Sequence, residues 1–266
     1  MPFFRHEGIQ IHWESIGEGE PVAFLNGILM TVDSWKLQTA QLSRRFRCLM
    51  HDFRGQLLSS KPADAWTLED HAEDFGALLD HLGIDSCHVV GTSYGGEVGM
   101  IFAANWPERV RSLTVIASVS ELGPDTERIA RDWRRAALEA PESLYRTMLP
   151  TTFSPEFVTA NPRLVELGDE RLNACDAEFF RAFARLVDAF FQLNITPGLK
   201  QIRCPTLIIA GEKDLLKPPR YSQIIADNIS GSKLLVAPGA GHAAVLEQPE
   251  WINTELMTFL KAHMPF

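Results

Sequence analysis

Residues 89–100 read VVGTSYGGEVGM, and this stretch decides which fold the chain can adopt. An apolar run ends, Ser93 stands two residues from both Gly91 and Gly95, and a second apolar run begins at once. The first run is typical of a buried strand, and the second of a helix that Pro107 ends. In so sharp a strand-to-helix turn, a side chain at either glycine position would collide with the neighbouring element. The pattern therefore predicts that the Ser93 hydroxyl projects from the turn, where the helix N-terminus favours a developing anion; an idle serine in a glycine-rich turn is the alternative.

Outward from this turn, short apolar strands alternate with helices of 3.6-residue period. Strands are expected at 21–27, 46–53, 87–93, 112–118, 205–211 and 233–237, and helices at 32–44, 67–82, 95–105, 218–229 and 249–261. Thr67 and Asp70 form a capping box that opens the second of these helices, and Gly83 ends it. Strands so uniformly apolar are buried on both faces. We therefore expect an α/β fold with a mostly parallel central sheet flanked by helices, and the alternating residues 8–17 add an edge strand or hairpin.

The alternation of strands and helices breaks between the strands at 112–118 and 205–211. Residues 124–140 and 176–193 have helical periodicity, and a proline-punctuated segment separates them. We expect a core domain of residues 1–119 and 199–266 and an inserted helical cap of residues 120–198 over the carboxyl edge of the sheet. A stripe of phenylalanines follows residues 179–191; it either packs the cap onto the core or lines an apolar substrate cavity.

Two further side chains are expected to act with Ser93. A serine hydroxyl is a poor nucleophile at neutral pH and needs a base, which in turn needs an orienting acid. His242 lies in the small-residue loop APGAGHAAV after the strand at 233–237, and Asp214 follows the strand at 205–211. Glu212 shares the loop of Asp214 and is the competing acid. The predicted catalytic residues are thus Ser93, His242 and Asp214.

Acyl transfer also requires donors for the oxyanion. One is the backbone N–H that follows the nucleophile, at Tyr94, and the other is the N–H of Ile28, after the strand at 21–27. Candidate substrate contacts flank these loops and the cap; they are Asn26, Leu29, Trp35, Phe153, Phe183 and Val245.

The motifs resemble those of the α/β-hydrolase fold superfamily along essentially the whole chain. GTSYGG is similar to that family's nucleophile elbow, GEKD to its acid loop and GAGHA to its histidine loop. Within the family, the closest similarity is to the 3-oxoadipate enol-lactonase and small carboxylesterase group. HDFRGQLLSSKP resembles a stretch that would make Asp52 and Arg54 structural. Asn26 stands where the family has a histidine before Gly27, and Leu57 replaces a glycine, which weakens any transfer of substrate preference.

Composition excludes several other classes of protein. The formal net charge is −9 over 266 residues, and no basic stripe could neutralise a phosphate backbone, so no nucleic-acid partner is expected. No apolar run approaches the ~20 residues that cross a bilayer, so no membrane partner is expected. The four cysteines show no metal-binding spacing, which predicts no metal and a reduced, cytoplasmic protein. A homo-oligomer stays possible.

The leading hypothesis is a cofactor-independent serine hydrolase that cleaves a carboxylic ester or lactone through an acyl-enzyme intermediate. A cofactor-free haloperoxidase or perhydrolase would use the same three residues. A third hypothesis, from another class, is a small-molecule receptor with a hydrolase fold and slow turnover.

Overall fold

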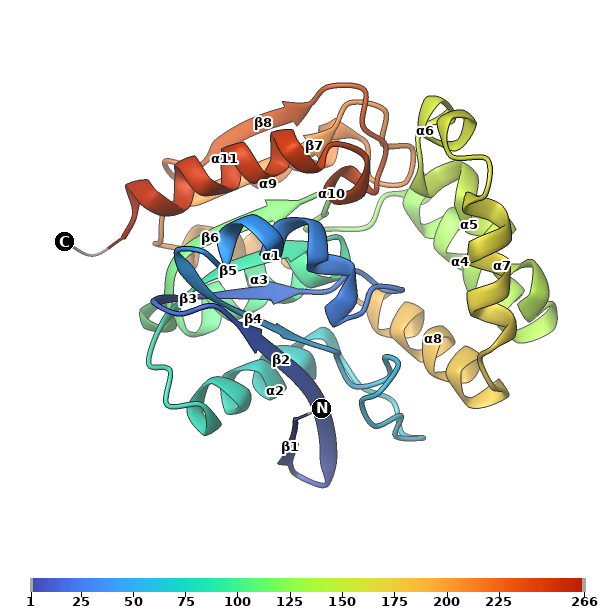
Figure 1. The fold of residues 1–266 in the computed structure, drawn as a ribbon, viewed down its shortest axis with the longest axis horizontal. Helices are drawn as coiled ribbons and strands as arrows, with labels where there is room; N and C mark the ends of the chain where they lie inside the picture. The colour runs from blue at the N-terminus through green and yellow to red at the C-terminus, as the bar shows by residue number, and fades with distance from the viewer. Residues whose placement is uncertain (1, 265–266) are drawn as a thin grey trace.

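The apolar strands form one eight-stranded sheet with the order β1-β2-β4-β3-β5-β6-β7-β8 (Figure 1). This computed structural model describes residues 2–264. The strand β1 pairs antiparallel with β2, and β2 pairs antiparallel with β4, whereas every other pairing is parallel. The strands are β1 (Phe3–His6), β2 (Ile9–Ile16), β3 (Glu20–Leu25), β4 (Phe46–His51), β5 (Cys87–Thr92), β6 (Val110–Ile116), β7 (Thr206–Gly211) and β8 (Lys233–Ala237). The predicted fold class is therefore confirmed.

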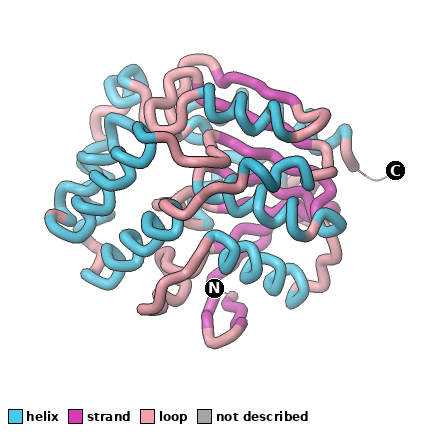
Figure 2. The backbone as a smooth tube through the Cα atoms, turned by 180° about the vertical axis from the view of Figure 1, so that it is seen from behind, coloured by secondary structure: helices cyan, strands magenta, loops and turns pink. Residues whose placement is uncertain are grey.

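Helices cover both faces of this sheet (Figures 1 and 2). The helices α1 (Lys36–Leu42) and α11 (Pro249–Ala262) pack on one face, with α10 (Ala244–Glu247) beside them. The other face carries α2 (Leu68–His81), α3 (Tyr94–Asn105) and α9 (Pro219–Asn228). Alternate residues of β3 join opposite cores, since Phe24 belongs to one cluster and Leu25 to the other. Burial on both faces explains why the central strands carry no polar stripe.

Short 3₁₀ turns connect several of these elements, and α2 begins with a capping box. The turns are η1 (Val32–Trp35), η2 (Pro107–Arg109), η3 (Pro141–Ser143) and η4 (Thr196–Gln201). The predicted capping box at the start of α2 is confirmed, because Asp70 N donates to Thr67 Oγ1 at 3.2 Å and Thr67 N donates to Asp70 Oδ2 at 2.6 Å. At the edge of the sheet, the hairpin turn lies at Glu7 and Gly8, both with positive φ, so β1 precedes the alternating stretch.

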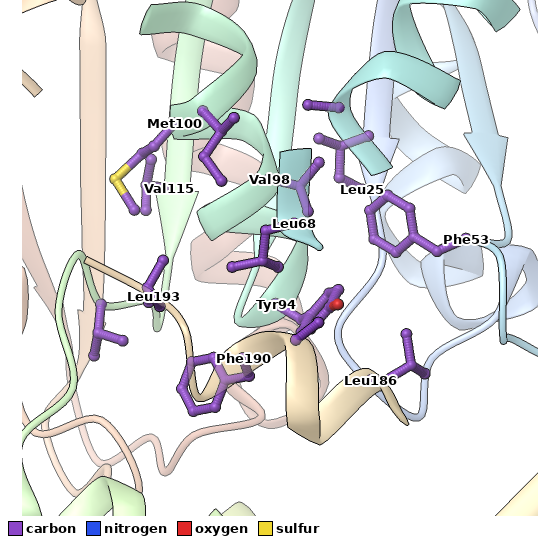
Figure 3. Packing of buried hydrophobic residues seen from close by; sticks show 14 of the residues in the cluster. Leu25, Phe53, Leu68, Tyr94, Val98, Met100, Val115, Leu186, Phe190 and Leu193 are labelled. Carbon is purple, nitrogen blue, oxygen red and sulfur yellow. The ribbon is translucent and has the colours of Figure 1, made fainter. Parts of the chain in front are cut away.

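Five helices stand between β6 and β7, in the stretch where the sequence predicts a cap. They are α4 (Pro124–Glu139), α5 (Leu144–Thr152), α6 (Pro155–Ala160), α7 (Leu164–Asn173) and α8 (Ala177–Phe190). Figures 1 and 2 show them together at one end of the sheet, opposite the end of α11. The phenylalanine stripe of α8 mainly packs this group onto the core: Phe190 and Leu186 lie beside Tyr94 (Figure 3). Among residues 2–264, no helix is both long enough and apolar enough to span a bilayer.

The side chains of two histidines, His51 and His71, are fully buried in the core. The ring of His51 stacks on Phe75 with centroids 5.6 Å apart, and His71 packs edge-on against Tyr94 at 5.4 Å. In the described part of the chain, neither imidazole has a hydrogen-bond partner. Burial lowers the pKa of His51 to about 3 and that of His71 well below its usual value. Burial thus holds both rings neutral, and the nearby Arg54 charge further disfavours the charged form of His71.

We predict that these rings make the fold sensitive to acid. Below about pH 6.5 the unfolded chain binds protons that the native imidazoles cannot accept, so stability is complete above that pH and is lost as the pH falls toward 3. Each buried ring should contribute about 1.4 kcal/mol of lost stability per pH unit in this window. Urea unfolding between pH 7.5 and 4.5 should show a shallower pH dependence for His51→Leu, whereas the exposed control His81→Gln should follow the wild type. Equal slopes in all three proteins would contradict the neutral state of His51.

Candidate active site

Ser93 occupies the turn between β5 and α3 in a backbone conformation that few residues adopt. Its φ is 52° and its ψ is −120°. A Cβ atom at Gly91 would overlap the Gly95 carbonyl, and one at Gly95 would overlap the Leu25 carbonyl at the end of β3. Neither overlap could be relieved, because all the atoms are backbone. The two glycines therefore permit the turn that lifts the Ser93 side chain above the sheet edge, at the N-terminus of α3.

A continuous chain of hydrogen bonds links Ser93 to His242 and Asp214. His242 Nε2 lies 2.8 Å from Ser93 Oγ, and His242 Nδ1 lies 2.8 Å from Asp214 Oδ2. The other carboxylate oxygen, Asp214 Oδ1, accepts from the backbone N–H groups of Leu216 at 2.9 Å and Lys217 at 2.7 Å. All three side chains are buried to within a tenth of their surface. The imidazole is thus oriented to receive a proton from Ser93 at Nε2 while Nδ1–H donates to Asp214.

The competing acid, Glu212, faces away from this chain. Its Oε2 accepts from the backbone N–H of Gly239 at 2.7 Å, and its side chain is exposed. The loop after β7 therefore directs Asp214, not Glu212, toward the imidazole.

The amides of Ile28 and Tyr94 lie beside Ser93. Both residues and Ser93 border a small cavity of about 20 Å³, enough for one oxygen atom or water. Within residues 2–264, neither amide N–H donates to a protein acceptor, and Tyr94 as the first residue of α3 has no intrahelical partner. The Tyr94 ring is buried against Phe53 and His71. Ile28 and Tyr94, whose amides have no acceptor among the described residues, thus border the same small cavity as Ser93.

A buried polar network holds the loop that carries Ile28. Asn26 Nδ2 donates to Asp52 Oδ1 and to Gln56 Oε1, both at 3.2 Å. Asn26 Oδ1 accepts from Trp35 Nε1 at 2.8 Å, and Gln56 Nε2 donates to the Gly27 carbonyl at 2.8 Å. Burial raises the pKa of the Asp52 carboxyl, and its hydrogen-bonded neighbours oppose that rise. The network therefore holds the peptide group between Gly27 and Ile28, which carries the Ile28 N–H.

This network corrects part of the sequence-based prediction of substrate contacts. Asn26 and Trp35 are fully buried and lie behind the cavity wall, because their polar atoms are used in the scaffold. Asp52 and Arg54 also make contacts within the scaffold; Arg54 binds both carboxylate oxygens of Asp74, at 2.7 and 2.8 Å.

A cavity of about 360 Å³ opens onto Ser93 and His242 between the core and the cap. Its walls are mainly apolar, and three predicted contacts, Leu29, Phe153 and Val245, line it. Phe183 lines a neighbouring cavity of about 90 Å³, together with Leu57, the residue that departs from the family pattern. The space can accept an apolar acyl or alcohol group next to the serine.

Three charged residues at this site are missed by sequence reasoning. Arg171 of α7 lines both cavities, and Arg171 Nη2 lies 3.4 Å from Thr31 Oγ1. Buried Lys217 and Glu97 form an ion pair beside Ser93. Burial raises the pKa of the Glu97 carboxyl, and the Lys217 ammonium opposes that rise. The only signal for the pair is a lone glutamate in the apolar sequence of α3, and no signal marks Arg171. No cluster of three or more His, Cys, Asp or Glu side chains suited to a metal ion occurs in residues 2–264.

Comparisons with known proteins agree with this architecture. Residues 20–249 match the family described as alpha/beta hydrolase fold. The chain is 28% identical to a putative carbamate hydrolase RutD of Caulobacter sp., with 94% of each chain covered. It is 27% identical to 3-oxoadipate enol-lactonase 2 of Acinetobacter baylyi, with 98% of this chain and 99% of that protein covered. An alpha/beta hydrolase enzyme from a Medee basin deep-sea metagenome library superposes with a TM-score of 0.94 at 26% identity, covering 100% of this chain and 98% of that one.

The network behind Ile28 generates a prediction about Ser93 reactivity. Trp35→Phe keeps a smaller aromatic ring but removes the indole N–H that donates to Asn26 Oδ1, which leaves a buried oxygen unpaired and loosens the loop. The rate at which diisopropyl fluorophosphate labels Ser93 should fall about tenfold, because the phosphoryl oxygen needs the same two amides. Mass spectrometry of the labelled protein measures this rate. Trp106→Phe, at the far end of α3, is the control, and equal rates in both variants would show that the network does not position the amide.

Proposed function

The chain belongs to the alpha/beta hydrolase fold family, and on that premise we propose that it is a serine hydrolase of carboxylic esters or lactones. The observation that carries the proposal is the hydrogen-bonded chain from Ser93 through His242 to Asp214, opening onto an apolar cavity. The reaction needs no cofactor, because nucleophile, base and oxyanion donors are all protein groups.

In the first half of the reaction, Ser93 Oγ attacks the carbonyl carbon of the substrate. The hydroxyl proton passes to His242 Nε2, and Asp214 stabilises the imidazolium from the other side of the ring. The carbonyl electron pair moves onto oxygen, which occupies the site between the Ile28 and Tyr94 amides. Each such donor is typically worth about 3 kcal/mol in the transition state. The tetrahedral intermediate collapses when His242 protonates the leaving alcohol.

In the second half, water hydrolyses the acyl-enzyme. His242 removes a proton from the water, the hydroxide adds to the acyl carbon, and Ser93 leaves with the proton that His242 returns. A lactone follows the same path, except that its alcohol and acid stay in one molecule. The cavity walls, with Leu29, Phe153 and Val245 among them, favour apolar groups on either side of the scissile bond.

Other reactions could use the same residues. A carbamate would place nitrogen on the acyl carbon, as the relationship to a putative carbamate hydrolase suggests. A perhydrolase would let peroxide replace water in the second half-reaction. A receptor with slow turnover would keep the geometry but release product slowly. Initial rates on an ester in water, and in acetate with peroxide, separate the hydrolase from the perhydrolase, and rates on a carbamate test the first possibility. Several turnovers per second on any ester would exclude the receptor.

We predict that Ser93→Ala abolishes hydrolysis and preserves the fold. Removal of Oγ deletes the nucleophile, so turnover should fall at least about 1000-fold, while thermal unfolding should match that of the wild type. The assay is a series of p-nitrophenyl esters of increasing chain length beside a panel of lactones and one aryl carbamate. Ser230→Ala, at an exposed position, is the matched control. Turnover that survives in Ser93→Ala would place the nucleophile elsewhere.

A further inference from the structure

A buried ion pair touches the serine that the proposed reaction uses. Lys217 Nζ lies 2.5 Å from Glu97 Oε1 and 3.2 Å from Ser93 Oγ. The Lys217 side chain is 3% exposed and that of Glu97 is fully buried. Glu97 Oε1 also accepts from the Val119 backbone N–H at 3.2 Å. Both charges therefore sit in the protein interior, and the ammonium of Lys217 is in direct contact with Ser93 Oγ.

Stability alone does not account for this pair. Removing two charges from water costs more than their attraction usually returns, and apolar side chains of similar volume often give a more stable protein. Glu97 stands in the first turn of α3, whose neighbouring residues are apolar and buried. In the described part of the chain, Glu97 Oε2 has no hydrogen-bond partner. Neither packing nor stability therefore explains why a charged pair occupies this position.

The ammonium group lies where negative charge would develop. Lys217 borders the same 20 Å³ cavity as Ser93, Ile28 and Tyr94. The ring of Phe190, from α8, lies 4.6 Å from Nζ and covers it on the cap side. The cap thus keeps bulk water from the ammonium, and in such a setting a charge acts more strongly on its neighbours than it would in water.

We propose that Lys217 is a further catalytic residue of the hydrolysis proposed above, on which this inference rests, and that Glu97 is a positioning residue. Lys217 donates through Nζ to Ser93 Oγ and stabilises the negative charge that builds on this oxygen and on the adjacent oxyanion. Glu97 holds Nζ in place and keeps it protonated.

The step balances without a proton from Lys217. The bond from Ser93 Oγ to the acyl carbon forms, the carbonyl π pair moves to oxygen, and the hydroxyl proton goes to His242 Nε2. Lys217 keeps its three protons throughout and shifts its hydrogen bond toward the growing charge. Neither His242 nor the two amides change role.

The pH dependence of the reaction tests the contact between Lys217 and Glu97. The charged or titratable groups around Nζ are Glu97 from α3, His242 from the loop after β8 and Asp214 from its own loop. Among the described residues, the cap presents apolar side chains there, including Trp133, Val187 and Phe190. A buried lysine without a carboxylate partner loses its proton at lower pH. In Glu97→Gln, the alkaline decline of Ser93 reactivity should therefore move to lower pH.

The test uses two variants of the whole protein and a reagent that needs no knowledge of the substrate. Diisopropyl fluorophosphate reacts when Ser93 Oγ bonds to phosphorus, fluoride leaves, and His242 takes the hydroxyl proton. Labelling rates are measured from pH 6 to 10 for the wild type, for Glu97→Gln and for the charge-free variant Glu97→Gln/Lys217→Met. The control is Lys213→Met/Glu156→Gln, which removes an exposed ion pair, with N–O distance 2.6 Å, that also involves the loop after β7.

Below the alkaline decline of the wild type, the charge-free variant should label 10- to 100-fold more slowly, and it should lack that decline, while its thermal unfolding temperature stays equal to or above that of the wild type. The control should match the wild type. A charge-free variant that labels as fast as the wild type would overturn the proposal. So would a charge-free variant that loses its reactivity because it no longer folds. No labelling of wild-type Ser93 would overturn it as well. The labelling rate could depend on Lys217 although the protein cleaves no ester, lactone or carbamate. That result would support the role of Lys217 and contradict only the proposed function.

Discussion

The backbone contact between the Ser93 turn and the end of β3 is the constraint on which the site depends. Gly95 lies so close to the Leu25 carbonyl that only hydrogen fits between them. This contact sets the Ser93 side chain beside the loop that begins at Asn26, and it therefore brings Ser93 and Ile28 to the edge of the same small cavity. Any side chain at Gly91 or Gly95 would separate the strands and helix that hold the two groups in register.

Two separate groups of buried polar side chains lie near that contact. Behind the loop, Asn26, Asp52 and Gln56 bond to one another and to Trp35, so that the loop keeps its shape although it carries no regular structure. Beside the serine, Lys217 and Glu97 form an ion pair whose ammonium lies 3.2 Å from Ser93 Oγ. The Phe190 ring of α8 covers Lys217 Nζ, and away from water an electrostatic interaction is stronger.

The sequence predicted the elements well where a local rule applied. The glycines around Ser93, the capping box at Thr67 and the fully apolar strands each have one stable local solution, and the structure has it. Predictions about side-chain direction were weaker. Asn26 and Trp35 do lie next to the site, but their side chains turn into the scaffold. Arg171 was not anticipated, since the spacing of residues in a cap helix does not say where that helix docks.

By itself, the sequence determined the α/β alternation, the turn at Ser93, and the strand ends from which Asp214 and His242 emerge, because these follow from apolar periodicity and from glycine's lack of a side chain. Only the tertiary structure decided that Asp214 rather than Glu212 faces the imidazole, that Lys217 reaches Ser93 and pairs with Glu97, and which side chains wall the cavity. Those outcomes depend on contacts between residues more than a hundred positions apart in some cases, such as the 124 positions between Ser93 and Lys217. No local preference encodes such contacts; the packing of the whole chain does.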